Sequence, residues 1–174
     1  TERDTFKTEI EKYLNTEQYL KWLAGVVCTQ NFDGFVHNYS LYLNSQTGLF
    51  EIMPWDFDAT WGRDINGHEM PYDYVRCQGY NTLTVRLLDL PYYQEMYISL
   101  LTEILNEKFT TEYMSPIIDK QFNTLLPFIQ EDPYLKENQD KFANEPDFIR
   151  SFIRKRNAFL KDDLAKWAIG LGKS

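Results

Sequence analysis

The sequence is poor in the residues that build metal frameworks and disulfide scaffolds. Its 174 residues include two cysteines, Cys28 and Cys77, and two histidines. Zinc sites need closely spaced Cys or His pairs, and neither cysteine has such a neighbour. We therefore expect no structural zinc site, and we expect no disulfide between the two thiols.

Positive charge and long apolar runs are also scarce. The chain has 18 Lys and Arg against 26 Asp and Glu, a net charge of -8 and a pI near 4.8. Nucleic acids and anionic membranes are bound through Lys and Arg, so this balance argues against both and suits a cationic protein substrate better. No apolar run reaches the length of a membrane span.

Enough apolar residues remain for one hydrophobic core. They make up 43% of the chain, and aromatic residues make up 16%, which predicts a single domain over residues 1–174. Helical spacing predicts helices before residue 30, one of them capped by Asn15, and again after residue 82. Of the later helices, one begins at a Ser115-Pro116 cap, and the last runs from about Pro146 to Leu164. The predicted fold class is α+β and mostly helical.

A change of period separates the two helical regions. Between residues 38 and 53, apolar and polar residues alternate on both sides of a Ser-Gln-Thr-Gly segment, which predicts a β-hairpin with a five-residue loop. Pro54 lacks the N–H that a strand interior needs, so residues 55–58 should leave the hairpin as a loop. Residues 61–81, which contain Pro71 and several glycines, form a long irregular segment typical of functional loops.

Polar residues flank this hairpin in an order suited to phosphoryl transfer. Asp33 precedes Asn38 by five positions, and Asp56 and Asp58 follow the second strand. Transfer from a nucleotide needs a carboxylate that orients the attacking hydroxyl, together with an amide and a further carboxylate that hold magnesium. Protein kinases place these groups in the same order along the chain. The hairpin can bring both acidic stretches to one mouth.

Two longer strings make the match specific. They are N-F-D-G-F-V-H-N-Y-S-L-Y, which starts at Asn31, and F-E-I-M-P-W-D-F-D-A-T-W-G-R, which starts at Phe50. They resemble the spore coat protein H family, whose signature joins an H-N-Y-x-L-Y strand to I-P-W-D-x-D-x-T-W-G. The similarity continues to the helix at residues 147–162 and covers most of the chain.

That family is described as atypical protein kinases that use ATP and magnesium to phosphorylate serines in coat proteins. The resemblance implies a fold like the C-terminal lobe of a protein kinase, with the active-site loops carried by the hairpin. It implies that Asp33 is the catalytic aspartate, that Asn38 and Asp56 hold the magnesium of the nucleotide, and that Asp58 adds a metal ligand. The implied cofactor is Mg²⁺ or Mn²⁺ with ATP as co-substrate. The implied partner is a serine-rich protein of the spore coat or cell surface.

Other residues near these motifs have competing interpretations. His37 belongs to the residue type most often used as a general base, but a carboxylate is already supplied, so we expect it to lie outside the site. Arg63 and Arg76 either grip phosphate oxygens or pair with acidic residues. The large aromatics Trp55 and Trp61 should pack the loop in place.

The parts of a kinase that grip the nucleotide are missing. No G-x-G-x-x-G loop occurs, and no lysine lies in a convincing strand. We therefore interpret the chain as a C-terminal lobe with weak or absent transfer by itself. The alternative is a non-catalytic scaffold of the spore coat or cell surface, and a third hypothesis is a metal-assisted hydrolase, which lacks the usual His ligands. The joint presence of Asp33, Asn38 and Asp56 favours the enzyme.

Overall fold

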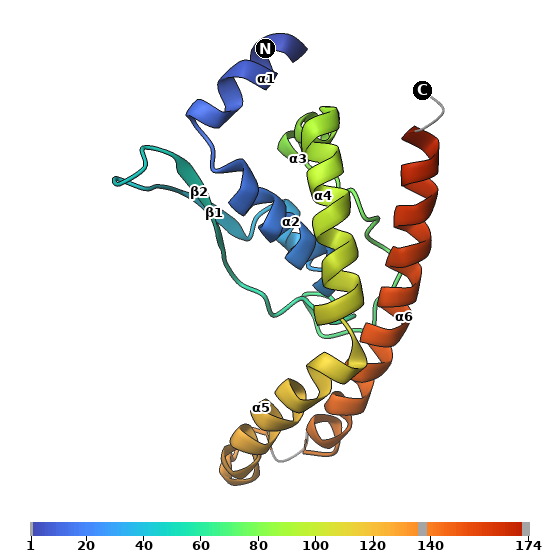
Figure 1. Cartoon of the computed structure of the whole chain (residues 1–174). Helices are drawn as coiled ribbons and strands as arrows, with labels where there is room; N and C mark the ends of the chain where they lie inside the picture. The colour runs from blue at the N-terminus through green and yellow to red at the C-terminus, as the bar shows by residue number, and fades with distance from the viewer. Residues whose placement is uncertain (1, 136–138, 172–174) are drawn as a thin grey trace.

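The computed structural model describes residues 2–135 and 139–171. The predicted class is confirmed, because the chain is mostly helical with one antiparallel hairpin (Figure 1). The elements in chain order are α1 (Arg3–Glu9), the 3₁₀ turn η1 (Ile10–Lys12), α2 (Thr16–Thr29), the 3₁₀ turn η2 (Asp33–Phe35), β1 (Tyr39–Leu43), β2 (Phe50–Pro54), α3 (Thr82–Leu88), α4 (Pro91–Glu103), the π-helical turn η3 (Ile104–Lys108), α5 (Thr111–Glu131) and α6 (Gln139–Leu171).

Helix α2 is the centre of the fold. It begins at the predicted cap, where the side chain of Asn15 accepts a hydrogen bond from the N–H of Gln18 at 3.1 Å. Buried residues from Tyr19 to Cys28 lie around most of its circumference. The reason is that α4 and α6 pack against it and β2 also contacts it. After α2 ends, Gln30 adopts a left-handed conformation with φ of 56°, which turns the chain sharply towards Asp33.

One edge of the hairpin is fastened to α2. β1 and β2 pair antiparallel, with Leu41 opposite Ile52. The N–H of Phe50 donates to the carbonyl of Tyr13 at 2.7 Å. The side-chain amide of Gln18 accepts from the N–H of Ile52 at 2.9 Å and donates to its carbonyl at 2.6 Å. The outward backbone groups of Phe50 and Ile52 in β2 are thus satisfied by α2 and the segment before it.

Several predicted boundaries are wrong. The hairpin connection comprises residues 44–49 and is one residue longer than expected. α6 extends beyond its predicted range at both ends, so Pro146 lies inside it. α5 begins a turn earlier than predicted and is capped by the side chain of Thr110, not by Ser115. Tertiary contacts support the added turns of α6, because Phe142 packs against Phe122 of α5 and Trp167 packs against Tyr97 of α4, and the helix therefore continues past the positions that local sequence signals mark.

A buried arginine on α6 joins three parts of the chain. Arg156 is fully buried, and its Nε and Nη2 donate to the carbonyl of Val27 at 3.2 and 2.7 Å. Its Nη1 donates to the carbonyl of Tyr72 at 2.7 Å. Burial lowers the pKa of Arg156 to about 10, so the guanidinium stays charged at neutral pH. It therefore ties α6 to the end of α2 and to the irregular 61–81 segment.

Further buried contacts hold the 61–81 segment to the core. The carboxylate of Asp163, which is 2% exposed, accepts from the N–H of Cys77 at 2.8 Å. The hydroxyl of Tyr97 donates to the carbonyl of Cys77 at 2.6 Å. Both thiols, Cys28 and Cys77, are free and buried, and burial raises the pKa of each. The segment is therefore a packed part of the fold.

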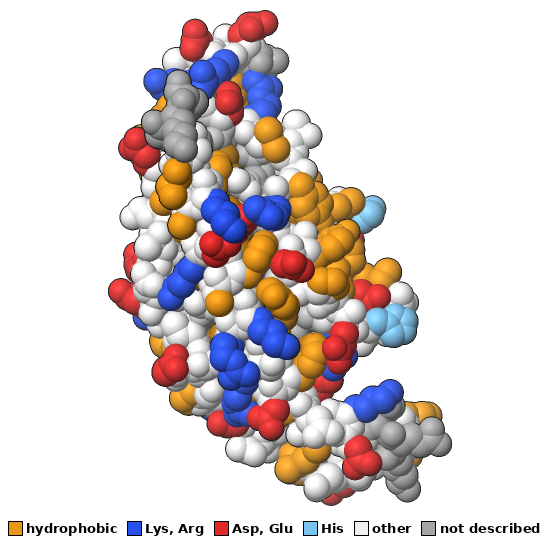
Figure 2. Space-filling view, turned by 90° about the vertical axis from the view of Figure 1, so that its right-hand side faces the viewer, with side chains coloured by type: hydrophobic (Ala, Val, Ile, Leu, Met, Phe, Trp, Pro, Cys, Tyr) orange, Lys and Arg blue, Asp and Glu red, His pale blue; other side chains and the backbone are white. Residues whose placement is uncertain are grey.

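The side of the molecule formed by α6 carries mixed charge. Figure 2 shows Lys and Arg side chains interspersed with Asp and Glu over this face. Arg63 pairs with Glu145 at 2.5 Å, and Arg76 pairs with Asp163. The ion-pair interpretation of both arginines is the one that the structure supports. In the part of the chain that the structure describes, no helix has the length and apolar character needed to cross a membrane.

Replacing Arg156 by alanine should destabilise the protein strongly. Arg156→Ala leaves the buried carbonyls of Val27 and Tyr72 without their donors, and losing charge-assisted hydrogen bonds in a buried site costs about 3 kcal/mol or more. We expect the urea midpoint of unfolding to fall accordingly. The exposed Arg154 lies on the same helix, so Arg154→Ala is the control and should change the free energy of unfolding by less than about 0.5 kcal/mol. Equal effects of the two changes would contradict this role of Arg156.

Candidate functional site

Asp33 lies in the tight turn η2 that follows α2. Its backbone carbonyl accepts hydrogen bonds from the N–H groups of Val36, His37 and Asn38 at 3.0, 2.9 and 3.2 Å. These bonds bring the residue five positions later back beside the aspartate. The Asp33 side chain is 22% exposed, so its carboxylate reaches the surface while most of it is shielded.

Both carboxylate oxygens of Asp33 have partners. Oδ2 accepts from Nδ2 of Asn38 at 2.8 Å, and Oδ1 lies 3.2 Å from Nδ1 of His37. The same Nδ2 of Asn38 lies 3.4 Å from the backbone carbonyl oxygen of Asp56. The structure thus brings together three of the predicted site residues, Asp33, Asn38 and Asp56, because the start of β1 and the end of β2 lie at the same open end of the hairpin.

The loop after β2 has an unusual backbone at its predicted metal ligand. Asp56 has a φ of 54°, a left-handed conformation that residues other than glycine seldom adopt. Such conformations are concentrated at functional sites. Asp58 lies two residues on, and its Oδ1 accepts from the N–H of Ala59 at 2.8 Å. The side chains of Asp56 and Asp58 are both exposed.

These carboxylates do not form a ready-made metal cluster. Within residues 2–135 and 139–171, no three His, Cys, Asp or Glu side chains converge in a way that would hold an ion. The oxygen donors predicted for a metal are the Asn38 amide and the exposed carboxylates of Asp56 and Asp58. Because Nδ2 of Asn38 is bonded to Asp33, its Oδ1 is the atom left to face a cation. A metal held here therefore needs further ligands from a bound substrate.

The expectation that His37 lies outside the site is wrong. Its ring nitrogen contacts the Asp33 carboxylate, while 75% of the side chain is exposed. The sequence contained a signal for this contact, because residues four apart in a helical turn face each other. His68 lies elsewhere, beside Asp64 in the 61–81 segment.

Two more residues support the turn that carries Asp33, and the sequence patterns did not single them out. The hydroxyl of Tyr80 donates to the carbonyl of Phe32 at 2.6 Å. The buried Asn31 accepts from the N–H of Gly34 through its Oδ1 at 2.9 Å. Asparagine three positions before the glycine of a turn is a local signal that could have been used. No local signal marks Tyr80, since its contact spans 48 positions of the sequence.

The two tryptophans of the motif behave differently. Trp61 packs the loop as predicted, with its ring stacked on Phe109 at 6.2 Å between centroids. The prediction is wrong for Trp55, which is 70% exposed. Strand alternation gives the reason, because Trp55 continues the face of Met53, the outer face, whereas Ile52 points inwards.

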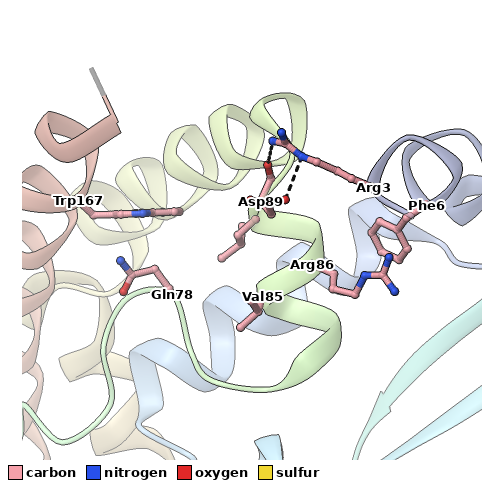
Figure 3. Close-up of a pocket in the computed structure, with 8 residues that line it drawn as sticks. Arg3, Phe6, Gln78, Val85, Arg86, Asp89 and Trp167 are labelled. Atoms are coloured by element: carbon pink, nitrogen blue, oxygen red, sulfur yellow. Dashed lines mark hydrogen bonds and ion pairs between the residues drawn. The ribbon is translucent and has the colours of Figure 1, made fainter. Parts of the chain in front are cut away.

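A separate cavity of about 520 Å³ lies away from this site. At its rim Arg3 pairs with Asp89 at 2.9 Å, and the ring of Trp167 extends from α6 towards Asp89 (Figure 3). It is lined by Arg3, Phe6, Gln78, Val85, Arg86, Leu88, Asp89 and Trp167. None of the predicted site residues belongs to this lining. The cavity is therefore distinct from the group formed by Asp33, Asn38 and Asp56, which we call the Asp33 cluster.

Comparison with known proteins places the cluster in a family. The family described as CotH kinase protein matches residues 1–160. The chain belongs to this family. It is similar to the inner spore coat protein H of Bacillus subtilis (strain 168), with 51% identity over 160 residues, which is 92% of this chain and 44% of the relative. This confirms the resemblance to spore coat protein H.

A second relative of the same organism is more distant. The inner spore coat protein H-like protein is 26% identical over 163 residues, or 94% of this chain and 50% of the relative. The chain therefore spans about half the length of the curated relatives that it matches. The Asp33 cluster lies inside the segment shared with the CotH kinase protein family.

Removing the Tyr80 hydroxyl should loosen the Asp33 turn. Tyr80→Phe deletes the donor to the Phe32 carbonyl, and a lost hydrogen bond of about 1 kcal/mol raises local opening about fivefold. Hydrogen exchange at the amides of His37 and Asn38, which are bonded to the Asp33 carbonyl, should quicken by that factor. Tyr74→Phe is the control, because the ring contact of Tyr74 with Phe32 remains.

The effect of Tyr80 should also depend on pH. Burial is the main cause that raises the pKa of Tyr80 from 10.0 to about 12. The stabilisation from this phenol is therefore complete below pH 10.0 and is lost as the pH rises to about 12. Unchanged exchange in Tyr80→Phe at neutral pH would show that the hydroxyl does not hold the turn.

Proposed function

We propose that this member of the CotH kinase protein family forms the metal-binding half of an ATP- and magnesium-dependent protein serine kinase. The contact that carries the proposal is the Asn38 amide, whose Nδ2 binds the Asp33 carboxylate at 2.8 Å and lies 3.4 Å from the Asp56 carbonyl. A scaffold has no physical need for this arrangement. Phosphoryl transfer needs an acceptor-orienting carboxylate beside an amide and a second carboxylate.

Each residue has a distinct task in this proposal. Asp33 accepts a hydrogen bond from the serine hydroxyl and orients it towards the phosphoryl group. Asn38 holds Asp33 in place through Nδ2 and presents its amide oxygen to the metal. Asp56 contributes a carboxylate, and Asp58 is close enough in sequence to contribute a second one. His37 covers one oxygen of Asp33 and has to move aside when the serine binds.

The donor set fits magnesium. Carboxylate and amide oxygens are the hard ligands that Mg²⁺ prefers, and Mg²⁺ completes its shell with water and phosphate oxygens. When bound, the metal would neutralise charge on the transferred phosphate. The few protein ligands suit an ion that arrives together with ATP.

The arrangement of elements supports a kinase-like C-terminal lobe. A helix leads to the base-bearing turn, a hairpin follows, and the metal-binding loop comes after its second strand. Such order is an analogy with protein kinases and rests on topology. We propose that the nucleotide-gripping lobe belongs to other parts of a longer protein, since the relatives are about twice the length of this chain.

The names of the relatives suggest a place of action. One is named inner spore coat protein H and the other inner spore coat protein H-like protein, and we propose that this protein acts in the spore coat on a serine-rich coat protein. The alternative function is a coat scaffold without catalysis. The exposed apolar side chains of Tyr42, Met53 and Trp55 on the hairpin favour it, because scaffolds bind through such surfaces.

The proposed longer protein that would include this chain is called the parent here. Phosphate transfer by the parent tests the proposal. With labelled ATP, magnesium and a serine-rich acceptor, we expect transfer by the parent and a loss of about a hundredfold or more in Asp33→Asn and in Asp56→Asn. Asp73→Asn is the control, because Asp73 is exposed and lies outside the cluster. A parent that binds its coat partners but transfers no phosphate would sink the kinase proposal and leave the scaffold.

Metal binding by the 174-residue chain can be measured separately. Without a nucleotide we expect weak binding of Mn²⁺, because the protein offers few ligands. Paramagnetic broadening should reach the amide signals of Asn38 and Asp56 first and should diminish in Asp56→Asn. Broadening centred on any other acidic group would place the metal elsewhere.

A further inference from the structure

The two edges of the hairpin differ. The N–H of Asn44 donates to the carbonyl of Leu49 at 2.9 Å, which fixes the alternation of the antiparallel ladder. The backbone N–H and C=O groups of the even-numbered β1 residues therefore face β2, whereas those of Leu41 and Leu43 face outwards. Among the described residues, no hydrogen bond reaches these outward groups. The corresponding edge of β2 is occupied, as the contacts of Gln18 with Ile52 show.

A groove lies beside the open edge. Its volume is about 290 Å³, and its wall on the hairpin side includes Leu41, which is 49% exposed. The residues that line it are Tyr39, Leu41 and Ile52 from the hairpin, and Tyr19, Asn81, Thr82 and Leu83 from α2, the α3 cap and α3. A strand added alongside β1 would alternate its side chains, so every second one would enter this groove.

The charge at one end of the β1 edge indicates which side chains a bound peptide would carry. β1 begins directly after Asn38, which is bonded to Asp33 and contacts Asp56. The carboxylate of Asp33 therefore lies at the start of the edge, and the acidic residues Asp56 and Asp58 follow the end of the paired strand β2. Lys and Arg are the side chains that complement such a group.

We propose that the outer edge of β1 binds the acceptor segment of the protein substrate as an added strand. This inference rests on the proposed kinase function and specifies its substrate as an extended segment. An apolar residue of the segment fills the groove beside Leu41, and basic residues flank the serine that lies at Asp33. The open backbone groups recur at every second residue, a spacing that an extended peptide matches and a helix does not.

Binding of a designed peptide to the 174-residue chain tests this site directly. The probe is a fluorescent peptide with a Leu-Thr-Leu centre and with lysine and serine on both sides, so that either strand direction is possible. We expect saturable binding by anisotropy. N-methylation of the central backbone amides removes the peptide's donors and should weaken binding about tenfold, the equivalent of about 1.4 kcal/mol.

Variants of the protein separate the backbone contact from the groove. Leu41→Pro removes one outward N–H at an edge position where proline is tolerated, and it should weaken binding about tenfold. Leu41→Ala keeps that N–H and reports on the groove alone. Tyr42→Ala, on the opposite face, is the matched control and should bind normally. Circular dichroism checks that each variant is folded.

The outcomes distinguish this inference from the proposed function. Equal binding of the methylated and unmethylated peptides, or no binding, would overturn the docking site. Self-association that Leu41→Pro abolishes would also overturn it, with a second copy as the occupant. Peptide binding at the edge together with a parent that transfers no phosphate would instead overturn the kinase proposal alone.

Discussion

The position of the candidate site depends on the buried guanidinium of Arg156. A charge with no exposed surface is stable only where every donor meets an acceptor, and here the acceptors are the carbonyls of Val27 and Tyr72. Val27 lies in the last turn of α2, so its carbonyl belongs to the negative end of the helix dipole. Three segments that are distant in sequence must therefore meet at one point. That point lies a few residues before the turn that carries Asp33.

From this anchor the site is built by short backbone contacts. The chain leaves α2 through the left-handed Gln30, and the Asp33 carbonyl then gathers three N–H groups. The end of the anchored 61–81 segment returns to the same turn, where Tyr80 donates to Phe32. Gly79 has a φ of 64°, and a Cβ there would lie 2.5 Å from the Phe35 ring, so glycine permits this close approach. The Asp33 carboxylate is thus held by packing on both sides of the turn.

Local patterns predicted the parts of this arrangement that local chemistry determines. The Asn15 cap and the alternation in the hairpin depend on neighbours in sequence, and so does the spacing of Asp33 and Asn38, which lie in one turn. The failures involve contacts between distant segments. No local signal marks Arg156, because the carbonyl of Val27 that it meets lies 129 positions away. Tyr80 and the true ends of α6 depend in the same way on partners that no local window contains.

The contrast between the hairpin edges has a physical meaning. An open strand with exposed apolar side chains invites unwanted pairing, and proteins usually protect such edges with lysine, proline or a covering element. β2 is protected by Gln18 and the segment before α2. β1, with the sequence Tyr-Ser-Leu-Tyr-Leu, has neither lysine nor proline, and all five of its residues are exposed. The proposed strand addition fits an edge that no element of the described residues covers, because a cover from within the chain would compete with the substrate.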